Sequence, residues 1–187
     1  MKPMTLNVNT KLMACLLSLF AGIASASSDC DLTVSQAQTN FGTFNRGTLS
    51  QAANGTQTNV IGKKSTTVTI VCPRPERITL LYRAASSGVG EGYQLGDIAH
   101  VTLVASDAQA DGKSVSLAYQ QQGGAAPEGN ANTLAILPNI GIAPTTSEPV
   151  THLTLQLTSV ASVNDINQHV KDHKMLNGSG ILEVVSE

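Results

Sequence analysis

Short stretches in which apolar and polar residues alternate make up much of the chain beyond residue 30. The clearest is Ser65–Cys72, where β-branched residues predominate and a period of two places Val68 and Ile70 on one face. Side chains of a strand point alternately to its two faces, so this pattern predicts a strand with one buried face. We expect Pro73 and Pro75 to end it, because proline has no N–H to donate to a neighbouring strand.

The same alternation predicts about eight or nine strands in all. Turn signals separate them, and Asp111-Gly112 and Asn177-Gly178 are the clearest. The other predicted strands lie at residues 32–34, 41–44, 78–82, 98–105, 115–119, 134–137, 153–157 and 181–185. The connections at 51–59, 88–96 and 120–130 are predicted loops, and the polar segment 163–174 predicts a long loop or a helical turn.

A long segment with the helical period of 3.6 residues is missing from the sequence. Many short strands with frequent turn signals are typical of two packed antiparallel sheets. The sequence therefore predicts an all-β protein with an antiparallel β-sandwich.

The first 26 residues have the three parts of an export signal. Lys2 and Lys11 supply positive charge, residues 12–23 form an apolar run, and Ala24-Ser25-Ala26 supplies the small residues of a cleavage site. The apolar run is shorter than the roughly 20 residues that a membrane-spanning helix needs. We therefore predict a signal peptide at 1–26, cleavage between Ala26 and Ser27, and a single domain at 27–187.

Two other interpretations of this segment stay open. A retained membrane anchor would use the same apolar run. A lipoprotein would use Leu12-Met13-Ala14-Cys15, which looks like a lipobox, although most of the apolar run follows Cys15 instead of preceding it.

Two cysteines, Cys30 and Cys72, remain after the predicted cleavage. In an exported chain they most simply form one disulfide bond. That bond would close a loop of about 43 residues and stabilise the fold by roughly 4 kcal/mol in the chain-entropy model. Two free thiols or a metal-binding pair are the alternatives.

Charge and aromatic content argue against some classes of partner. Removal of Lys2 and Lys11 with the signal lowers the formal net charge from −2 to −4. The remaining Lys and Arg residues form no basic stripe, so we expect no nucleic acid or anionic membrane surface as a partner. Aromatic residues make up 3% of the chain, which leaves few side chains for stacking on bases or sugars.

Several segments, in this order, resemble the opening of chaperone–usher fimbrial subunits (pilins). Those proteins have an early strand after a first cysteine, a segment with an aromatic residue followed by glycine, and a strand that ends in the second cysteine. The matching segments here are Cys30–Val34, Asn40–Phe44, Gly47–Ser50 and Thr67–Cys72. Gly92–Gly96 and Ala110–Val115 are more specifically similar to a family of uncharacterised fimbrial-like exported proteins.

The resemblance implies an immunoglobulin-like sandwich that is incomplete, because it lacks its last strand. A periplasmic chaperone would lend a strand, an outer-membrane usher would assemble the fibre, and a neighbouring subunit would replace the chaperone's strand. It implies a structural role in cell adhesion or pilus biogenesis, and a location in the periplasm or in a fimbrium on the cell surface.

Two features depart from the family's pattern. Cleavage after Ala26 would leave Ser27, Ser28 and Asp29 before Cys30, without the donor segment that family members carry there. Such a chain would accept a strand but not donate one, and we expect it at a fibre tip or outside the polymer. The family's penultimate tyrosine is also missing from the final Glu183–Glu187.

Histidine provides the one candidate metal pair. His169 and His173 are four residues apart and would share a face if the segment were helical. Because no third ligand stands out, we interpret them as part of a solvated loop and predict no metal site. His100 and His152 lie in strand patterns and are interpreted as structural.

Catalytic signatures are missing from the sequence. Neither G-x-S-x-G nor H-E-x-x-H occurs, and the glycines from Gly88 to Gly92 do not spell a phosphate-binding motif. The sequons at Asn54 and Asn177 are interpreted as turns. We predict no catalytic residues, no enzyme activity and no small-molecule cofactor.

Three functions outside the fibre shaft stay open. The chain is alternatively a single-domain tip adhesin that binds a host receptor. The second alternative is a self-sufficient periplasmic protein of unknown role. The third is a periplasmic hydrolase or metal-binding protein.

Overall fold

The computed structural model describes residues 30–42, 50–51, 59–88, 92–121, 127–163 and 176–186. In these ranges the chain forms β-strands and no helix, and the strands make two antiparallel sheets packed face to face. The prediction of an all-β antiparallel sandwich is confirmed. Within the same ranges no helix has the length and apolar character needed to cross a membrane.

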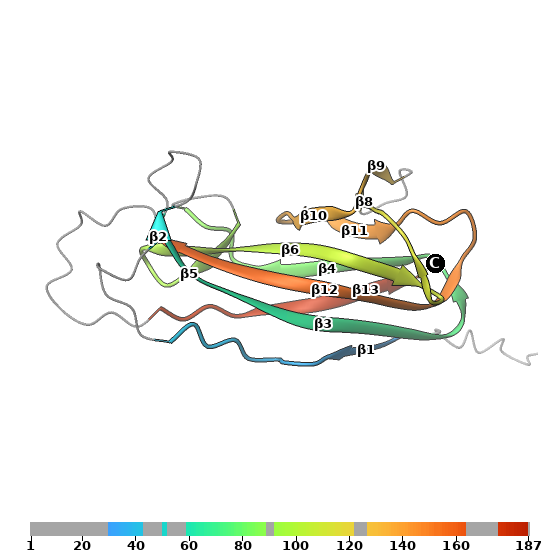
Figure 1. Ribbon diagram of the computed structural model, residues 1–187, viewed down its shortest axis with the longest axis horizontal. Coiled ribbons are helices and arrows are strands. Elements are labelled where there is room, and N and C mark those ends of the chain that lie inside the picture. The colour runs from blue at the N-terminus through green and yellow to red at the C-terminus, as the bar shows by residue number, and fades with distance from the viewer. Residues whose placement is uncertain are drawn as a thin grey trace, which may run out of the picture.

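The first sheet has eight strands, five of which form a continuous path. In spatial order these five are β1 (Asp31–Val34), β3 (Asn59–Glu76), β12 (Val150–Val163), β6 (Ala99–Ala110) and β10 (Thr133–Ile136). Three short strands pair beside this path, namely β2 (Ser50–Gln51) on β3 and both β5 (Tyr93–Leu95) and β7 (Lys113–Ser114) on β6. The long strands β3, β12 and β6 run the length of the molecule (Figure 1).

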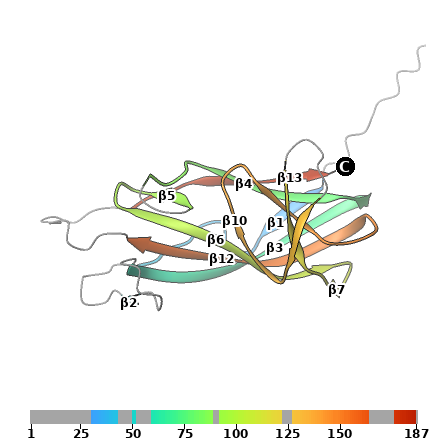
Figure 2. The same ribbon diagram turned by 90° about the horizontal axis from the view of Figure 1, so that it is seen from above.

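The second sheet has five strands. In spatial order they are β13 (Gly180–Ser186), β4 (Ile78–Ala84), β11 (Gly141–Pro144), β8 (Leu117–Gln120) and β9 (Glu128–Ala131). Seen from above, its strands β4 and β13 lie to one side of β6, β12 and β3 of the first sheet (Figure 2).

Alternating side chains of both sheets form the core between them. Val68 and Ile70 of β3 are fully buried, as the period of two predicts, and Leu153 and Leu155 of β12 lie beside them. Leu80 of β4 enters the same cluster from the second sheet. Full burial of each such side chain contributes roughly 1.5–3 kcal/mol, so the core is the main source of stability.

Six strands follow the order of an immunoglobulin sandwich, and β10 in the first sheet and β11, β8 and β9 in the second extend beyond that pattern. In the seven-strand pattern, strands A, B, E and D form one sheet, and C, F and G form the other. Here β1, β3, β12 and β6 occupy A, B, E and D, while β4 and β13 occupy C and F. Strand G would pair with the free edge of β13, and none of the described strands lies there.

One side of the sandwich is closed by the chain itself. Strand β9 ends the second sheet and β10 ends the first, and Asn132 alone separates the two strands in sequence. This direct crossover joins the two sheets at that side. The strands at the opposite side, β1 and β13, have no such connection.

The prediction that Pro73 and Pro75 end the third strand is wrong. Strand β3 continues to Glu76, where it pairs with Val150 of β12. The register shifts between this pair and Val71–His152, so both prolines fall in an irregular stretch without a regular ladder partner. A proline is tolerated where no hydrogen bond is required of its nitrogen.

Other strand boundaries also differ from the prediction. The predicted loops 88–96 and 120–130 contain β5 and the start of β9, and β11 has no predicted counterpart. Phe41 lies outside any strand and packs at Gly62 of β3; residues 43–49 are outside the described ranges. The strands β5, β9 and β11 are only three or four residues long, so local alternation does not reveal them.

Candidate functional site

Strand β1 forms one of the two sheet edges at the unconnected side of the sandwich. Cys30, immediately before it, is joined to Cys72 of β3 by a disulfide bond, in agreement with the prediction. Leu32 and Val34 point toward the core but remain only partly buried. The residues between and before them, Thr33 and Asp31, face solvent.

The free side of β1 also carries unpaired backbone groups. The amide of Ser35 donates to the carbonyl of Thr67 at 2.9 Å, so Ser35 and Thr67 form a hydrogen-bonded pair. Every second pair before it along β1 is then also hydrogen-bonded, namely Thr33–Thr69 and Asp31–Val71. Antiparallel ladders alternate, so the intervening residues Leu32 and Val34 direct their N–H and C=O groups away from β3. These groups face the unconnected side of the sandwich.

Strand β13 forms the other edge. It pairs with β4 along its whole length, from Gly180 opposite Ala84 to Ser186 opposite Ile78. Leu182 and Val184 pack against the core but are only partly buried. On the outer face Ile181 is 68% exposed.

Together, β1 and β13 form what we call the open seam. Each is the last strand of its sheet, they do not pair with each other, and Leu32, Val34, Leu182 and Val184 all pack against the same core cluster. Both strands run along the long axis of the molecule (Figure 1). The open seam thus combines partly buried apolar side chains with backbone groups that have no strand partner within the described ranges, an arrangement that can accept an added strand.

The start of β13 is held by close packing. Gly180 lies directly against the ring of Tyr82, where a side chain would collide. Tyr82 packs edge-to-face on Tyr93 with ring centroids 4.7 Å apart, and the Tyr93 hydroxyl donates to the Tyr82 carbonyl at 3.4 Å. Burial, together with the neighbouring Tyr82, raises the pKa of Tyr93 to about 12, so this pair stays neutral and packs as part of the core.

The segment before β13 was predicted to be a turn at Asn177-Gly178, and this is wrong. The segment has no turn; it runs beside β5, and the amide of Gly96 donates to the carbonyl of Asn177 at 2.9 Å. A Cβ at Gly178 would lie 2.7 Å from the Gln94 carbonyl oxygen. Glycine is needed here for close approach of two backbones, not for a turn.

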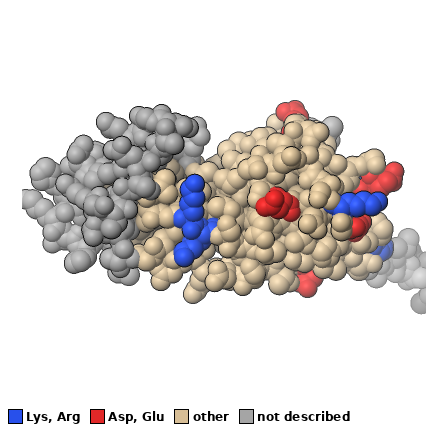
Figure 3. Space-filling model, viewed as in Figure 1, with Lys and Arg blue, Asp and Glu red and all other residues tan. Residues whose placement is uncertain are grey.

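Surface charge is sparse around these elements. On the face seen in Figure 3, the blue and red side chains form small separate groups on a largely uncharged surface. On the outer side of β13, Arg83 and Glu183 form an ion pair, with the guanidinium donating to the carboxylate.

Several predicted site residues lie outside the described ranges, namely Ala26, Ser27, His169 and His173. Across the described residues no three His, Cys, Asp or Glu side chains gather as metal ligands. His100 is buried, and its Nδ1 atom has no hydrogen-bond partner. His152 contributes its backbone amide to a hydrogen bond with Asp111.

The sequence contained a partial signal for the open seam. A strand was predicted at 181–185, and the structure places it as β13, with Leu182 and Val184 packed against the core. The pairing of β1 with β3 was not evident, since only four residues form it and the paired residues, from Asp31–Val71 to Val34–Val68, lie far apart in sequence, a non-local contact that a local pattern does not specify.

Comparisons with known proteins add no family assignment. No protein-family model matches the chain, and no curated protein matches it in sequence.

Proposed function

We propose that the chain is a fimbrial or fimbrial-like structural subunit, assembled by donor-strand complementation. A periplasmic chaperone first supplies a strand along β13, and a neighbouring subunit's strand takes its place when the usher assembles the fibre. The observation that carries the proposal is the vacant strand position at the open seam. This proposal places the protein in the periplasm after export and at the cell surface after assembly.

The chemistry of the open seam supports a strand as the occupant. An added strand satisfies the unpaired N–H and C=O groups of β13 and places alternate side chains toward Leu182 and Val184. Because these side chains already pack on the core from one side, the incoming residues complete their burial. Each Å² of apolar surface so buried contributes about 25 cal/mol.

The open seam also gives a reason for a chaperone to bind the chain before assembly. An edge with unpaired backbone and partly buried apolar side chains is an aggregation site in a chain alone. A chaperone that covers the seam in the periplasm removes this hazard, and replacement by a subunit's strand keeps it covered in the fibre.

Co-expression tests the proposal. The full-length chain is exported in cells with and without a chaperone from the same fimbrial gene cluster, and soluble periplasmic protein is measured. We expect a soluble complex with the chaperone, and aggregation or degradation of most of the chain without it. A chain that is equally soluble and stable alone would contradict strand acceptance.

A pair of adjacent residues on β13 provides a matched comparison. Val184 points toward the core at the open seam, whereas Val185 is on the outer face of the same strand. We expect Val184→Ser to weaken recovery of the chaperone complex by at least about tenfold, since a polar group would face the incoming strand. Val185→Ser should leave recovery within about twofold of the wild type. Circular dichroism of both recovered complexes separates lost binding from lost folding.

A further inference from the structure

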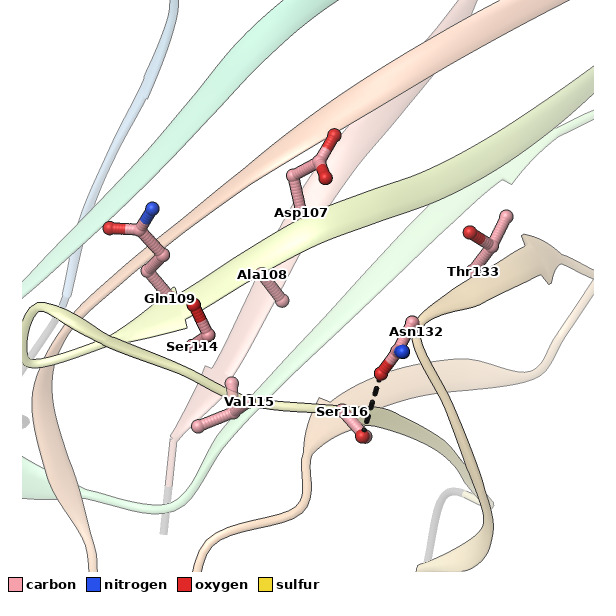
Figure 4. Close-up of a pocket in the computed structure, with 8 residues that line it drawn as sticks. All are labelled: Asp107, Ala108, Gln109, Ser114, Val115, Ser116, Asn132 and Thr133. Carbon is pink, nitrogen blue, oxygen red and sulfur yellow. Dashed lines mark hydrogen bonds between the residues drawn. The ribbon is translucent and has the colours of Figure 1, made fainter.

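A polar cavity lies away from the open seam, where three strands of the first sheet diverge. Strand β10 pairs with residues 103–106 of β6, and β7 pairs with residues 109–110, so Asp107 and Ala108 lie between them. The gap forms a shallow cavity of about 370 Å³ that is open to solvent, since Asp107, Gln109 and Ser114 in its lining are exposed. Figure 4 shows its lining residues around Ala108.

A β-bulge creates this cavity. On β12, Leu155 alone stands opposite two residues of β6, Asp107 and Ala108. The insertion reverses the alternation of β6: Leu103 and Ala105 are buried before the bulge, and Ala108 and Ala110 after it.

The bulge turns Asp107 outward from a position that the alternation would otherwise bury. Its φ is +51°, an uncommon conformation for a residue with a side chain, and bulges of this kind are frequent beside functional sites. The structure therefore holds a carboxylate at the cavity by means of a specific backbone distortion.

The other side of the cavity is built where the chain changes sheets. Val115 and Ser116 lead from β7 to β8, and Asn132 leads from β9 to β10. The Ser116 hydroxyl donates to the Asn132 side-chain oxygen at 3.0 Å, which links the two crossovers (Figure 4). The amide of Val115 donates to the carbonyl of Ala108 at 2.9 Å and fixes this side of the cavity to the bulge.

The lining residues define the chemistry of a ligand. Asp107 offers an acceptor, whose Oδ2 already accepts from the Ser106 hydroxyl at 3.1 Å. Gln109 and Ser114 add groups that can both donate and accept, while Ala108 supplies an apolar patch. Among the described residues that line the cavity there is no Lys or Arg, which disfavours anions, and no aromatic side chain, which disfavours flat rings.

We propose that this cavity binds a neutral polyhydroxylated ligand of the size of one sugar ring. Separate hydroxyls of such a ligand donate to the Asp107 carboxylate and accept from the amide of Gln109, because these two side chains extend in different directions from β6 (Figure 4). Apolar C–H groups of the ring contact Ala108. The site lies on the fourth and fifth strands of the first sheet, so a strand bound at the open seam leaves it accessible, and the proposal does not rest on strand acceptance.

Titration by nuclear magnetic resonance tests this proposal. The ¹⁵N-labelled protein, alone or in its chaperone complex, is titrated separately with galactose, glucose, mannose, fucose and N-acetylglucosamine. For at least one sugar we expect saturable shifts of the Ala108, Gln109 and Ser114 amides with a Kd in the millimolar range. Absence of saturable shifts with all five, or shifts that map elsewhere, would overturn the proposal.

Substitutions in the lining give the second readout. Asp107→Asn keeps a residue that tolerates positive φ, and Gln109→Ala changes an exposed strand position. We expect each to weaken the affinity by about tenfold, the effect of losing a hydrogen bond to a charged or well-placed partner. Gln121→Ala, an exposed glutamine outside the cavity, should leave the affinity unchanged. Unaltered affinity in both lining variants would contradict the site.

Discussion

Asp111 connects the turn between β6 and β7 to the beginning of β12. Its carboxylate accepts from the Thr151 hydroxyl at 2.9 Å, the Thr151 amide at 3.1 Å and the His152 amide at 2.9 Å. These hydrogen bonds, the one from the Thr151 hydroxyl first, hold the pKa of Asp111 below its ordinary value of 3.8. Asp111 also has a φ of +47°, which explains why the predicted Asp-Gly turn forms here.

We expect the Asp111 contacts to stabilise the fold at neutral pH and to fail in acid. Because its pKa is lowered in the folded state, their contribution is complete above 3.8 and is lost as the pH falls through the folded-state pKa. Asp111→Asn should lower the melting temperature at pH 7 and flatten its decline below pH 4. Thermal unfolding from pH 7 to 2 measures this, with Asp31→Asn, an exposed carboxylate on β1, as the control. Equal acid responses of Asp111→Asn and the wild type would contradict the account.

Protonation of His100 should lower the stability of the fold at a higher pH than protonation of Asp111 does. It lies on β6 opposite Ser162 of β12 and Gln94 of β5, neither of which is charged. Burial lowers the pKa of His100 below its ordinary value of 6.5, because the charged imidazole would lose its hydration. The unfolded chain therefore binds a proton more readily than the folded chain.

We expect the free energy of unfolding to decrease as the pH falls below 6.5 and to stop decreasing once His100 is protonated in the folded state. Chemical denaturation at pH 7.5, 6.5, 5.5 and 4.5 measures this decrease. His100→Gln, which cannot take up the proton, should remove most of it. A wild-type stability that is constant between pH 7.5 and 4.5 would contradict the buried neutral histidine.

At the scale of elements, the disulfide bond holds a strand that is too short to be stable alone. Strand β1 has four residues, and Cys30 fixes its beginning to Cys72 of β3. Ser35 and Thr66 extend the attachment beyond the strand through a hydrogen bond between their hydroxyls at 2.9 Å. The disulfide therefore positions one edge of the open seam.

Removal of the disulfide should destabilise the fold and release β1. For the double variant Cys30→Ser, Cys72→Ser we expect a loss of about 2–4 kcal/mol in the free energy of unfolding. Urea denaturation measures the loss, and the oxidised and reduced wild type provide the control pair. A difference below about 0.5 kcal/mol would show that β1 contributes little to the fold.

The other edge depends on a glycine. A side chain at Gly180 would collide with the Tyr82 ring, which is itself packed on Tyr93. We expect Gly180→Ala to destabilise the protein by about 1–3 kcal/mol through displacement of β13 or the tyrosine pair. Gly88→Ala, where a Cβ meets no atom within 4 Å, should change stability by less than about 0.5 kcal/mol. Equal effects of the two substitutions would contradict the close packing of β13.

The strands that the sequence predicted best are those with a strong local pattern. Residues 65–72 and 153–157 alternate clearly, and both lie at the centre of the first sheet within longer strands. Their true ends depend on each other, because β3 and β12 pair from Val163–Asn59 to Val150–Glu76. A local pattern cannot reveal how far two strands extend by pairing with each other.

The two candidate sites differ in how far the sequence predicted them. An open edge was expected from the resemblance to fimbrial subunits, and the strand that forms part of it was predicted at 181–185. The cavity was not expected, because it results from one inserted residue in β6. Asp107 stands in an otherwise regular alternation, and only the pairing with β12 reveals that the register shifts there.

At the scale of the whole molecule, the two sides of the sandwich are unequal. The β9–β10 crossover closes one side, while β1 and β13 leave the other without a shared strand. Stability comes from the common core, so the fold forms around Leu80, Ile70 and Leu155 even with one strand position vacant. The completed sandwich would be more stable than the chain alone, because a bound strand stabilises the folded state by mass action.

Hydrogen exchange along β13 tests strand acceptance most directly. In the chain alone, we expect alternate amides from Ile181 to Val185 to be protected by β4 and the intervening amides to exchange rapidly. In the purified chaperone complex, the rapidly exchanging amides should become protected by at least about tenfold, whereas amides of β9 should not change. Full protection of all β13 amides in the chain alone, or no change on complex formation, would contradict an open edge that receives a strand.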